Sequence, residues 1–418
     1  MSPAPPSRTP WFPALAEPRV RLYLLGQLMS MLGTWALDIT LNLLVWHHTG
    51  SAAALGLLNF MLYGPAVVVT PLLSTRLSAA NARRITASVL GIALVLALAL
   101  ALAAALQWLT LPLMLVAAGL RGVLGGMEVP SRQMLLMNIA EGPHLGSAVA
   151  MNTVVFLLAR TAGPGLAGLM FDPLGPAAAF VLACAGLGFM LICVLRLQGV
   201  HGPAPGLRSG AAGASGLRGA WAFVWADRFG SLMLPAVACV AFCAGAYQTL
   251  VPVLADRVFG DATRWTGWFF AAAGGGALVA AVLLSSRHMD ALLRRWLIIV
   301  PWGAVLALLL LGASSRPVPV LLGFALLGFG TSFVGTGTNA TLQRRVPPEA
   351  RGGMIALFLL AFTGAMPLSQ LAAGLLAQWL SVQVTFVLLA AALGAGLLAL
   401  CLPRWRRLGR LELDVSRL

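Results

Sequence analysis

Residues 32–48 read LGTWALDITLNLLVWHH and decide the fold class, because this apolar run carries a single acidic residue. The run belongs to an apolar stretch over 21–46, which is long enough to cross a hydrocarbon core of about 30 Å as a helix. Asp38 lies well inside it, where an ionised carboxylate is costly unless it is paired or faces water. We therefore expect a membrane helix with a carboxylate kept for function or for pairing.

The rest of the chain has the same character. Of its 418 residues, 60% are hydrophobic and 9% are charged, whereas soluble proteins carry roughly 25% charged residues. Apolar stretches recur near 21–46, 53–75, 85–106, 109–130, 145–171, 176–197, 229–255, 265–286, 295–312, 317–341, 352–379 and 382–402. They predict an all-α membrane protein with twelve transmembrane helices and no large soluble domain.

The basic residues indicate how the chain is oriented. All 27 are arginines, and they are scattered over short loops, so the net charge of +15 does not indicate nucleic-acid binding. The loops on the side of the N-terminus hold nearly all loop arginines, and the opposite side holds only Arg257, Arg264 and Arg316. Since cytoplasmic loops carry the excess of basic residues, we expect both termini in the cytoplasm.

A segment rich in Gly, Pro, Ser and Ala divides the chain into two related halves. The segment begins at residue 198, and MNTVVFLLARTAGPGLAG at 151–168 is similar to MIALFLLAFTGAMPLSQ at 354–370. Gly50 likewise aligns with Gly260. Two such halves are typical of transporters with alternating access to a central site. The expected organisation is a cytoplasmic N-terminal segment 1–20, six-helix bundles 21–197 and 229–402, a cytoplasmic linker 198–228 and a cytoplasmic tail 403–418.

Five stretches occur in this order: LGTW with LLVWHHTGSAAALGLL, MEVPSRQMLL, NTVVFLLARTAGPGLAG, PVLADRVFGDATRWTGWFFAAAGGGAL, and LQRRVPPEARGGMIALFLLAFTGAMPLSQLAAGLL. Together they resemble the major facilitator superfamily, and within it the branch of bacterial enterobactin exporters and macrolide efflux pumps. The resemblance covers residues 19–402. It implies two pseudo-symmetric six-helix bundles in the cytoplasmic membrane of a bacterium.

The resemblance also implies gating loops. The family's loop between helices 2 and 3 has a Gly, then Asp-Arg, then paired basic residues, but here LLSTRLSAANARR has Ala79 where the Asp is expected. The equivalent loop of the second half, SSRHMDALLRR, keeps its Asp. We expect a weak or one-sided latch. Its residues are Arg83, Arg84, Asp290, Arg294 and Arg295.

Two intramembrane arginines are candidate partners of Asp38. Arg121 precedes a Gly-rich stretch and resembles the family's arginine that is associated with proton coupling. Arg160 precedes GPGLAG, which resembles the antiporter signature of exporters, so the resemblance favours export. A carboxylate that alternates between an arginine and an apolar pocket can carry protons; a permanent ion pair is the alternative. Residues Gly163, Pro164 and Gly168 of the signature are expected to permit close packing and a bend.

A polar stripe follows the first helix, because Gln27, Ser30, Thr34, Asp38 and Asn42 are spaced by three or four residues. It either lines a substrate cavity or forms hydrogen bonds inside the N-terminal half. Further cavity candidates are Trp35, Asn152, Tyr247, Gln248, Thr336, Asn339, Thr363 and Gln370. Outside this set, Glu128 and Arg132 are expected to form a surface ion pair near the cytoplasmic end of helix 4.

These features predict an exporter that exchanges protons for a small amphipathic molecule, such as a siderophore or a drug-like compound, and works as a monomer. A large apolar part and an acidic group for an arginine are expected in the substrate. The alternatives are an importer or facilitator of the same fold, and a non-transporting sensor or partner protein. Enzyme chemistry, a metal site and a cofactor are not expected, because no nucleophile with a base, metal-ligand cluster or phosphate loop is found.

Overall fold

The computed structural model describes residues 13–74, 76–140, 145–197, 214–227, 229–285, 289–347 and 351–415, and over these residues it is helical, without strands. A short 3-10 helix, Pro13–Ala16, precedes the first long helix. The α-helices are α1 (Pro18–Thr49), α2 (Ala52–Ser74), α3 (Ala79–Ala105), α4 (Leu111–Ile139), α5 (Leu145–Leu174), α6 (Pro176–Arg196), α7 (Ala214–Ala226), α8 (Gly230–Gly245), α9 (Tyr247–Phe259), α10 (Ala262–Ser285), α11 (Met289–Ala313), α12 (Pro317–Arg345), α13 (Arg351–Thr363), α14 (Ala365–Trp379) and α15 (Val382–Val415).

The predicted set of twelve spans is confirmed. Twelve helical stretches in the described chain are long and apolar enough to cross a membrane, with α8 and α9 joined in one span and α13 and α14 in another. The matched glycines of the internal repeat have matching roles, because Gly50 and Gly260 both end a helix with a positive φ of 58° and 72°. Glycine adopts this left-handed conformation without a Cβ penalty, so each position stops a span and starts a turn.

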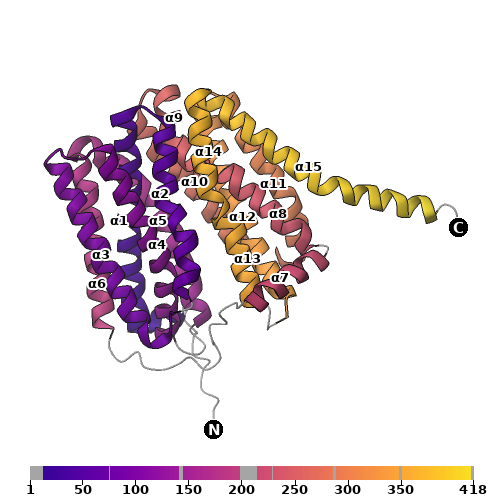
Figure 1. Ribbon diagram of the computed structural model, residues 1–418, viewed down its shortest axis with the longest axis horizontal. Helices are drawn as coiled ribbons and strands as arrows, with labels where there is room; N and C mark the ends of the chain where they lie inside the picture. Colours follow the sequence, from indigo (N-terminus) through magenta and orange to yellow (C-terminus); the bar gives the residue numbers. More distant parts are fainter. Residues whose placement is uncertain are drawn as a thin grey trace, which may run out of the picture.

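The spans form two halves that lie side by side (Figure 1). Helices α1–α6 make the N-terminal half, drawn in indigo to magenta, and α8–α15 make the C-terminal half, drawn in red to yellow. Two packed helix pairs join the halves, α2 with α14 and α5 with α10. The joined pairs lie between the halves, so any group at this interface can respond when one half moves against the other.

Small residues set the distance between helices inside each half. A Cβ added at Gly328 of α12 would lie 1.8 Å from the carbonyl oxygen of Ala273 in α10. A Cβ at Gly186 of α6 would lie 2.2 Å from the carbonyl oxygen of Met29 in α1. Helices in lipid gain little from apolar burial against each other, and close backbone approach at small residues is a main source of their packing energy.

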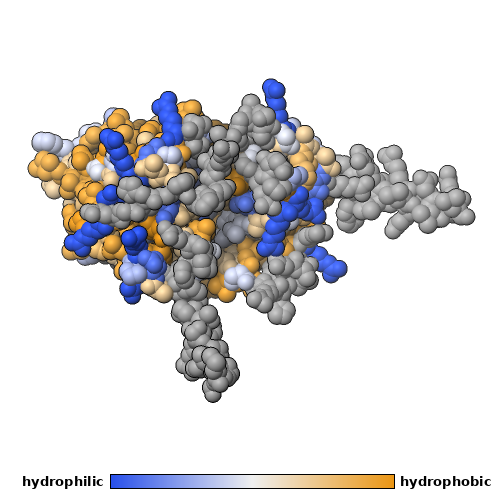
Figure 2. Space-filling model, turned by 90° about the horizontal axis from the view of Figure 1, so that it is seen from below, coloured by the Kyte–Doolittle hydropathy of each residue, from blue (hydrophilic) through white to orange (hydrophobic). Residues whose placement is uncertain are grey.

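The two ends of the molecule differ in charge. We call the end with the turns at Gly50, Gly175 and Gly260 the Gly50 end, and the opposite end, where α7 lies, the α7 end (Figure 1). Figure 2 views the α7 end and shows hydrophilic side chains projecting from this face, with apolar surface beside them. Exposed arginines of the loops and helix ends here include Arg19, Arg21, Arg76, Arg84, Arg196, Arg218, Arg295 and Arg344.

Three features differ from the sequence expectation. The predicted linker 198–228 contains a helix, α7, whose apolar side packs on α13 and α8. Helix α4 continues to Ile139, well past the predicted end at residue 130, and the last helix continues into the predicted tail. The junctions at Ala246 and Gly364 are no such difference, because both residues keep right-handed helical φ and ψ angles and each span is continuous.

Candidate functional site

The polar stripe of α1 faces the interior of the N-terminal half. Its five members are buried, and the side chains of Gln27 and Ser30 accept hydrogen bonds from Arg132 of α4, at 2.7 and 2.8 Å. Asn42 pairs with Asn59 of α2, whose Nδ2 donates to the Asn42 Oδ1 at 2.7 Å. Gln27, Ser30 and Asn42 thus form hydrogen bonds inside the N-terminal half, which is the second of the two alternatives for this stripe. Their polar groups are not free to bind a substrate. Thr34 is also buried there.

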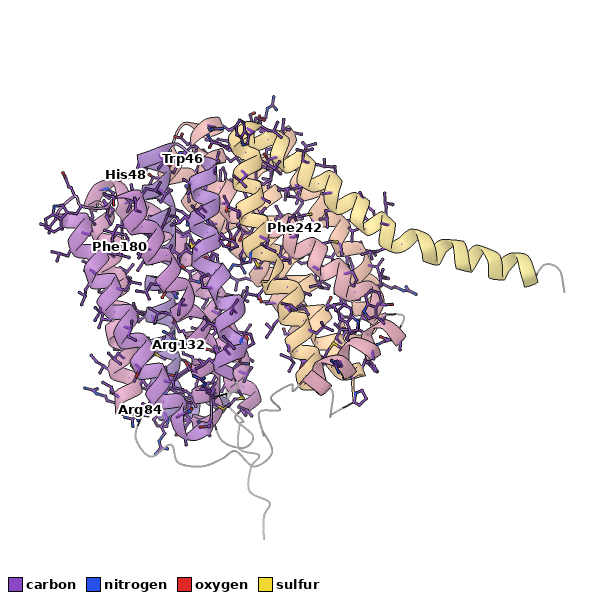
Figure 3. All side chains as sticks on the ribbon, viewed as in Figure 1. Trp46, His48, Arg84, Arg132, Phe180 and Phe242 are labelled. Atoms are coloured by element: carbon purple, nitrogen blue, oxygen red, sulfur yellow. The ribbon has the colours of Figure 1, made fainter. Side chains whose placement is uncertain are left out.

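The expected ion pair between Glu128 and Arg132 is present, but its expected location at the surface is wrong, because both side chains are buried. Only 3% of Glu128 and 2% of Arg132 is exposed, and the Arg132 Nη2 lies 2.6 Å from the Glu128 Oε1. The physical reason is the extra length of α4, which carries Arg132 against α1, where Gln27 and Ser30 receive its other donors. Tyr23 of α1 completes the network by donating to the Arg132 carbonyl oxygen at 2.9 Å. Figure 3 places Arg132 among the helices of the N-terminal half.

Arg121 lies between two carboxylates. Its Nε is 3.8 Å from the Asp38 Oδ1, and its Nη1 donates to the Glu128 Oε2 at 3.4 Å. Glu128 lies seven residues after Arg121 on the same helix, two turns towards the α7 end. The predicted neighbourhood of Asp38 and Arg121 is therefore confirmed, and Glu128 is a further member of the group that the sequence did not place there.

Asp38 is the least satisfied member of this charge cluster, which we define as Asp38, Arg121, Glu128 and Arg132. Asp38 is 6% exposed, and within the described residues its Oδ1 accepts no hydrogen bond. A buried ionised carboxylate without hydrogen bonds is expensive, and protonation removes that cost. The Glu128 Oε1 also lacks a hydrogen bond among the described residues, but Glu128 lies closer to its arginines, at 2.6 Å from Arg132 and 3.4 Å from Arg121, than Asp38 does at 3.8 Å. The cluster thus contains one firmly held carboxylate and one loosely held carboxylate.

Arg160 lies apart from this cluster and joins the two halves. Its Nη2 donates to the Tyr247 hydroxyl at 3.1 Å, from α5 of the first half to the start of α9 in the second. The guanidinium also lies 5.8 Å from the ring centroid of Trp35 on α1, within the range of a cation–π contact. Trp35 in turn meets Phe156 edge to face, with 6.4 Å between ring centroids. Arg160 does not pair with Asp38, which the sequence had left open.

The candidates in the C-terminal half divide into two groups. Gln370 of α14 donates to Gln248 of α9 at 2.8 Å, and both side chains are buried. Thr336, Asn339 and Thr363 lie closer to the α7 end: Thr336 and Thr363 are exposed, and Asn339 accepts a bond from Gln343 on its own helix. Asn152 of α5 is half-buried, and its Oδ1 has no hydrogen-bond partner in the described residues.

The halves are closed against each other at the Gly50 end. A Cβ at Gly374 of α14 would lie 2.7 Å from the Gly56 Cα of α2, and one at Gly168 of α5 would lie 3.0 Å from the carbonyl oxygen of Thr263 in α10. Arg257 of α9 lies over the Trp46 ring of α1 at 5.6 Å. Towards the α7 end the contacts thin out, because α2 packs along α14 but barely meets α13.

The antiporter-like segment of α5 has the packing role that its glycines imply. A Cβ at Gly163 would lie 2.5 Å from the Trp35 Cβ, so this glycine brings α5 against α1 directly beside Arg160. Pro164 lies inside α5, and Gly168, one turn on, meets the C-terminal half. The segment therefore contacts α1 beside Arg160 and contacts the C-terminal half at the closed Gly50 end.

We expect Gly374→Val to shift the protein towards a conformation that opens at the Gly50 end. A Cβ at this position would lie 2.5 Å from the Ala52 carbonyl oxygen, so a side chain separates α2 from α14. Spin labels at positions 48 and 379, both exposed at this end, report the separation of the halves by electron paramagnetic resonance. Their distance should increase, and the control Gly303→Val, where a Cβ meets nothing, should leave it unchanged. An unchanged distance in Gly374→Val contradicts the prediction.

The predicted gating arginines have unequal structural roles. Arg83 of α3 donates to the carbonyl oxygens of Val194 and Leu195, at 3.0 and 2.7 Å, and so caps the end of α6. Arg84 and Arg295 are exposed. Asp290 and Arg294 fall in α11, but their side chains lie outside the described residues, so the second latch stays a prediction.

The fold and this site define the class of the protein: a multi-pass helical membrane protein of two six-span halves, with buried charges in one half and an arginine that reaches across to the other. Residues 8–417 match the family described as transmembrane secretion effector, and the chain belongs to this family of the major facilitator superfamily. It is a membrane transporter and not an enzyme.

Similar proteins have related descriptions. The multidrug efflux pump Tap of Mycolicibacterium fortuitum is 27% identical over 93% of this chain and 96% of its own length. The staphyloferrin A transporter of Staphylococcus aureus is 25% identical, over 34% of this chain and 36% of its own length. Among solved structures, the nucleoside transporter NupG matches with a TM-score of 0.69 at 14% identity, over 91% of this chain and 98% of its own, which shows a shared fold.

Proposed function

We propose that this protein exports a small amphipathic compound, of the drug-like kind, across the bacterial cytoplasmic membrane in exchange for protons. The similarity to a multidrug efflux pump along almost the whole chain supports drug-like compounds over siderophores, because the similarity to the staphyloferrin A transporter covers only a third of it. A single chain contains both halves and the complete interface, so a monomer suffices.

The arginines orient this proposal in the membrane. They gather at the α7 end, and cytoplasmic loops carry the excess of basic residues, so the α7 end and both termini face the cytoplasm. The closed Gly50 end then faces outwards. This arrangement corresponds to a transporter that is open to the cytoplasm and ready to receive its substrate.

The observation that carries proton exchange is the placement of Arg121 between Asp38 and Glu128. When Asp38 takes a proton, Arg121 keeps a carboxylate partner, because Glu128 already lies 3.4 Å from its Nη1. Glu128 is then shared between Arg121 and Arg132, so the cluster carries one net positive charge, but each guanidinium keeps a carboxylate within ion-pair distance. When Asp38 releases the proton, the same guanidinium is within 3.8 Å to pair with it.

Direction and substrate are tested first in cells. Culture supernatants of a deletion strain and its parent are compared by mass spectrometry, and the exported compound should be depleted outside and enriched inside the deletion strain. Depletion inside the cells would indicate an importer. Equal profiles over a broad panel of added drugs would support the non-transporting alternative.

Coupling is tested with the compound found in this way. It should accumulate in inverted membrane vesicles while an acid-inside gradient is maintained, and a protonophore should release it. Equilibration to equal concentrations without a gradient would indicate a facilitator. Purified protein in sealed liposomes with an imposed pH gradient repeats the measurement without other transporters.

A further inference from the structure

The charge cluster in the N-terminal half is balanced without Arg160. Asp38 and Glu128 supply two negative charges, Arg121 and Arg132 supply two positive charges, and each carboxylate lies within ion-pair distance of an arginine of this set. The cluster is therefore electrically neutral, and none of its charges needs a ligand or a further residue as a partner.

Arg160 is an intramembrane cation without a counter-ion. Within the described residues it forms no ion pair with a carboxylate, and its polar side-chain partner is the hydroxyl of Tyr247. Charged side chains at this depth are rare and normally paired, because the membrane interior does not solvate them. The missing negative charge is therefore expected from outside the chain.

The donors of Arg160 are available for such a charge. Of the five N–H donors of a guanidinium, the described contacts use one, the Nη2 that donates to Tyr247 at 3.1 Å. The side chain is partly exposed, in contrast to the buried Tyr247. The remaining donors can form the bidentate, charge-assisted pair that guanidinium makes with a carboxylate.

Aromatic residues of both halves lie beside this cation. Trp35 and Phe156 lie on the N-terminal side, and both are partly exposed. On the C-terminal side Tyr247 is held by Phe270 and Phe324, at centroid distances of 5.8 and 6.1 Å. Trp35 and Phe156 can therefore contact the apolar part of a ligand beside Arg160, while the buried rings of Phe270 and Phe324 fix the position of Tyr247.

We propose that Arg160, Trp35 and Tyr247 form a binding site for an aromatic or large apolar carboxylate, in which the ligand's carboxylate pairs with Arg160. The proposal rests on the transport function proposed above and names the substrate class. It also identifies Arg160, and not the already balanced Arg121, as the arginine that meets the acidic group. Because the site spans both halves, an occupied site changes the contact between α5 and α9.

The test uses purified full-length protein in detergent, with 9-anthracenecarboxylate and its uncharged methyl ester as matched fluorescent probes. The carboxylate should bind at least about tenfold more tightly than the ester, as expected for one charge-assisted pair. Equal affinity of the wild-type protein for both probes would overturn the proposal, and this comparison needs no variant.

Variants then assign the preference to the residue. In Arg160→Gln the preference for the carboxylate should be lost while the ester still binds, and in Arg160→Lys it should be partly kept, because charge remains without the planar fork. Arg264→Gln, at an exposed arginine of the Gly50 end, is the matched control and should behave as wild type. A full preference for the carboxylate in Arg160→Gln would place the anion elsewhere and refute the site.

This binding measurement is made without a proton gradient, so its failure is separable from a failure of the proposed function. If the protein prefers the carboxylate probe but accumulates nothing in vesicles, the binding site is supported and proton exchange is refuted. If it accumulates compounds in a proton-dependent way but binds both probes equally, the transport function is supported and the binding site is refuted.

Discussion

Asp38→Asn is expected to abolish proton-driven accumulation in inverted vesicles, down to the level of vesicles without the protein. Asparagine has nearly the same shape but carries no exchangeable proton, so Arg121 would stay with Glu128 throughout the cycle. The chain should still fold, because the Asp38 side chain makes no hydrogen bond through its buried Oδ1. Size-exclusion profiles of the purified variant check this.

The same variant should still exchange substrate for substrate across the membrane. Binding is expected at Arg160, outside the charge cluster, so labelled compound trapped in liposomes should leave when unlabelled compound is added outside. This result separates a loss of coupling from a loss of binding. Asp172→Asn, at an exposed carboxylate at the Gly50 end of α5, is the matched control and should accumulate substrate as the wild type does. Full gradient-driven accumulation by Asp38→Asn would show that the proton binds elsewhere.

The spans could be predicted from the sequence because lipid imposes one requirement on all of them, an apolar run of about 20 residues. The contacts between spans could not. Ser369 of α14, for example, donates to the carbonyl oxygen of Phe242 in α8, and these residues are 127 positions apart.

The residues of the candidate site could likewise be predicted only in part. Asp38 and Arg121 are recognisable as single charges in apolar runs, so their approach was foreseeable. The sequence places Arg132 at the surface because the fourth span is expected to end near residue 130, but α4 continues to Ile139. The polar face of α1 was the available signal, since Gln27 and Ser30 needed partners inside the half.

The partner of Arg160 could not be predicted from the sequence, for a different reason. Tyr247 lies 87 residues away, in the other half, and no periodicity within α5 points to it. The internal repeat relates the two halves to each other but does not say which side chains meet between them.

Arg132→Met is expected to give the largest loss of stability of any single replacement in the charge cluster. The change removes the ion pair at 2.6 Å and leaves Glu128, which is 3% exposed, with only the longer contact to Arg121. Breaking one partner out of a buried pair costs about 3–5 kcal/mol, because the remaining charge is left in a medium that does not solvate it. Gln27 and Ser30 also lose the donors that they accept from.

The double variant Glu128→Gln with Arg132→Met tests whether this cost comes from the stranded charge. It removes both charges together, and replacing a whole buried pair by neutral groups is often nearly neutral for stability, so the unfolding midpoint in mixed detergent micelles should return most of the way to wild type. A double variant as unstable as Arg132→Met would mean that packing of the arginine stem and its bonds to α1 provide the stability. The double variant should also couple protons poorly, because Arg121 then has no carboxylate to pair with when Asp38 is protonated.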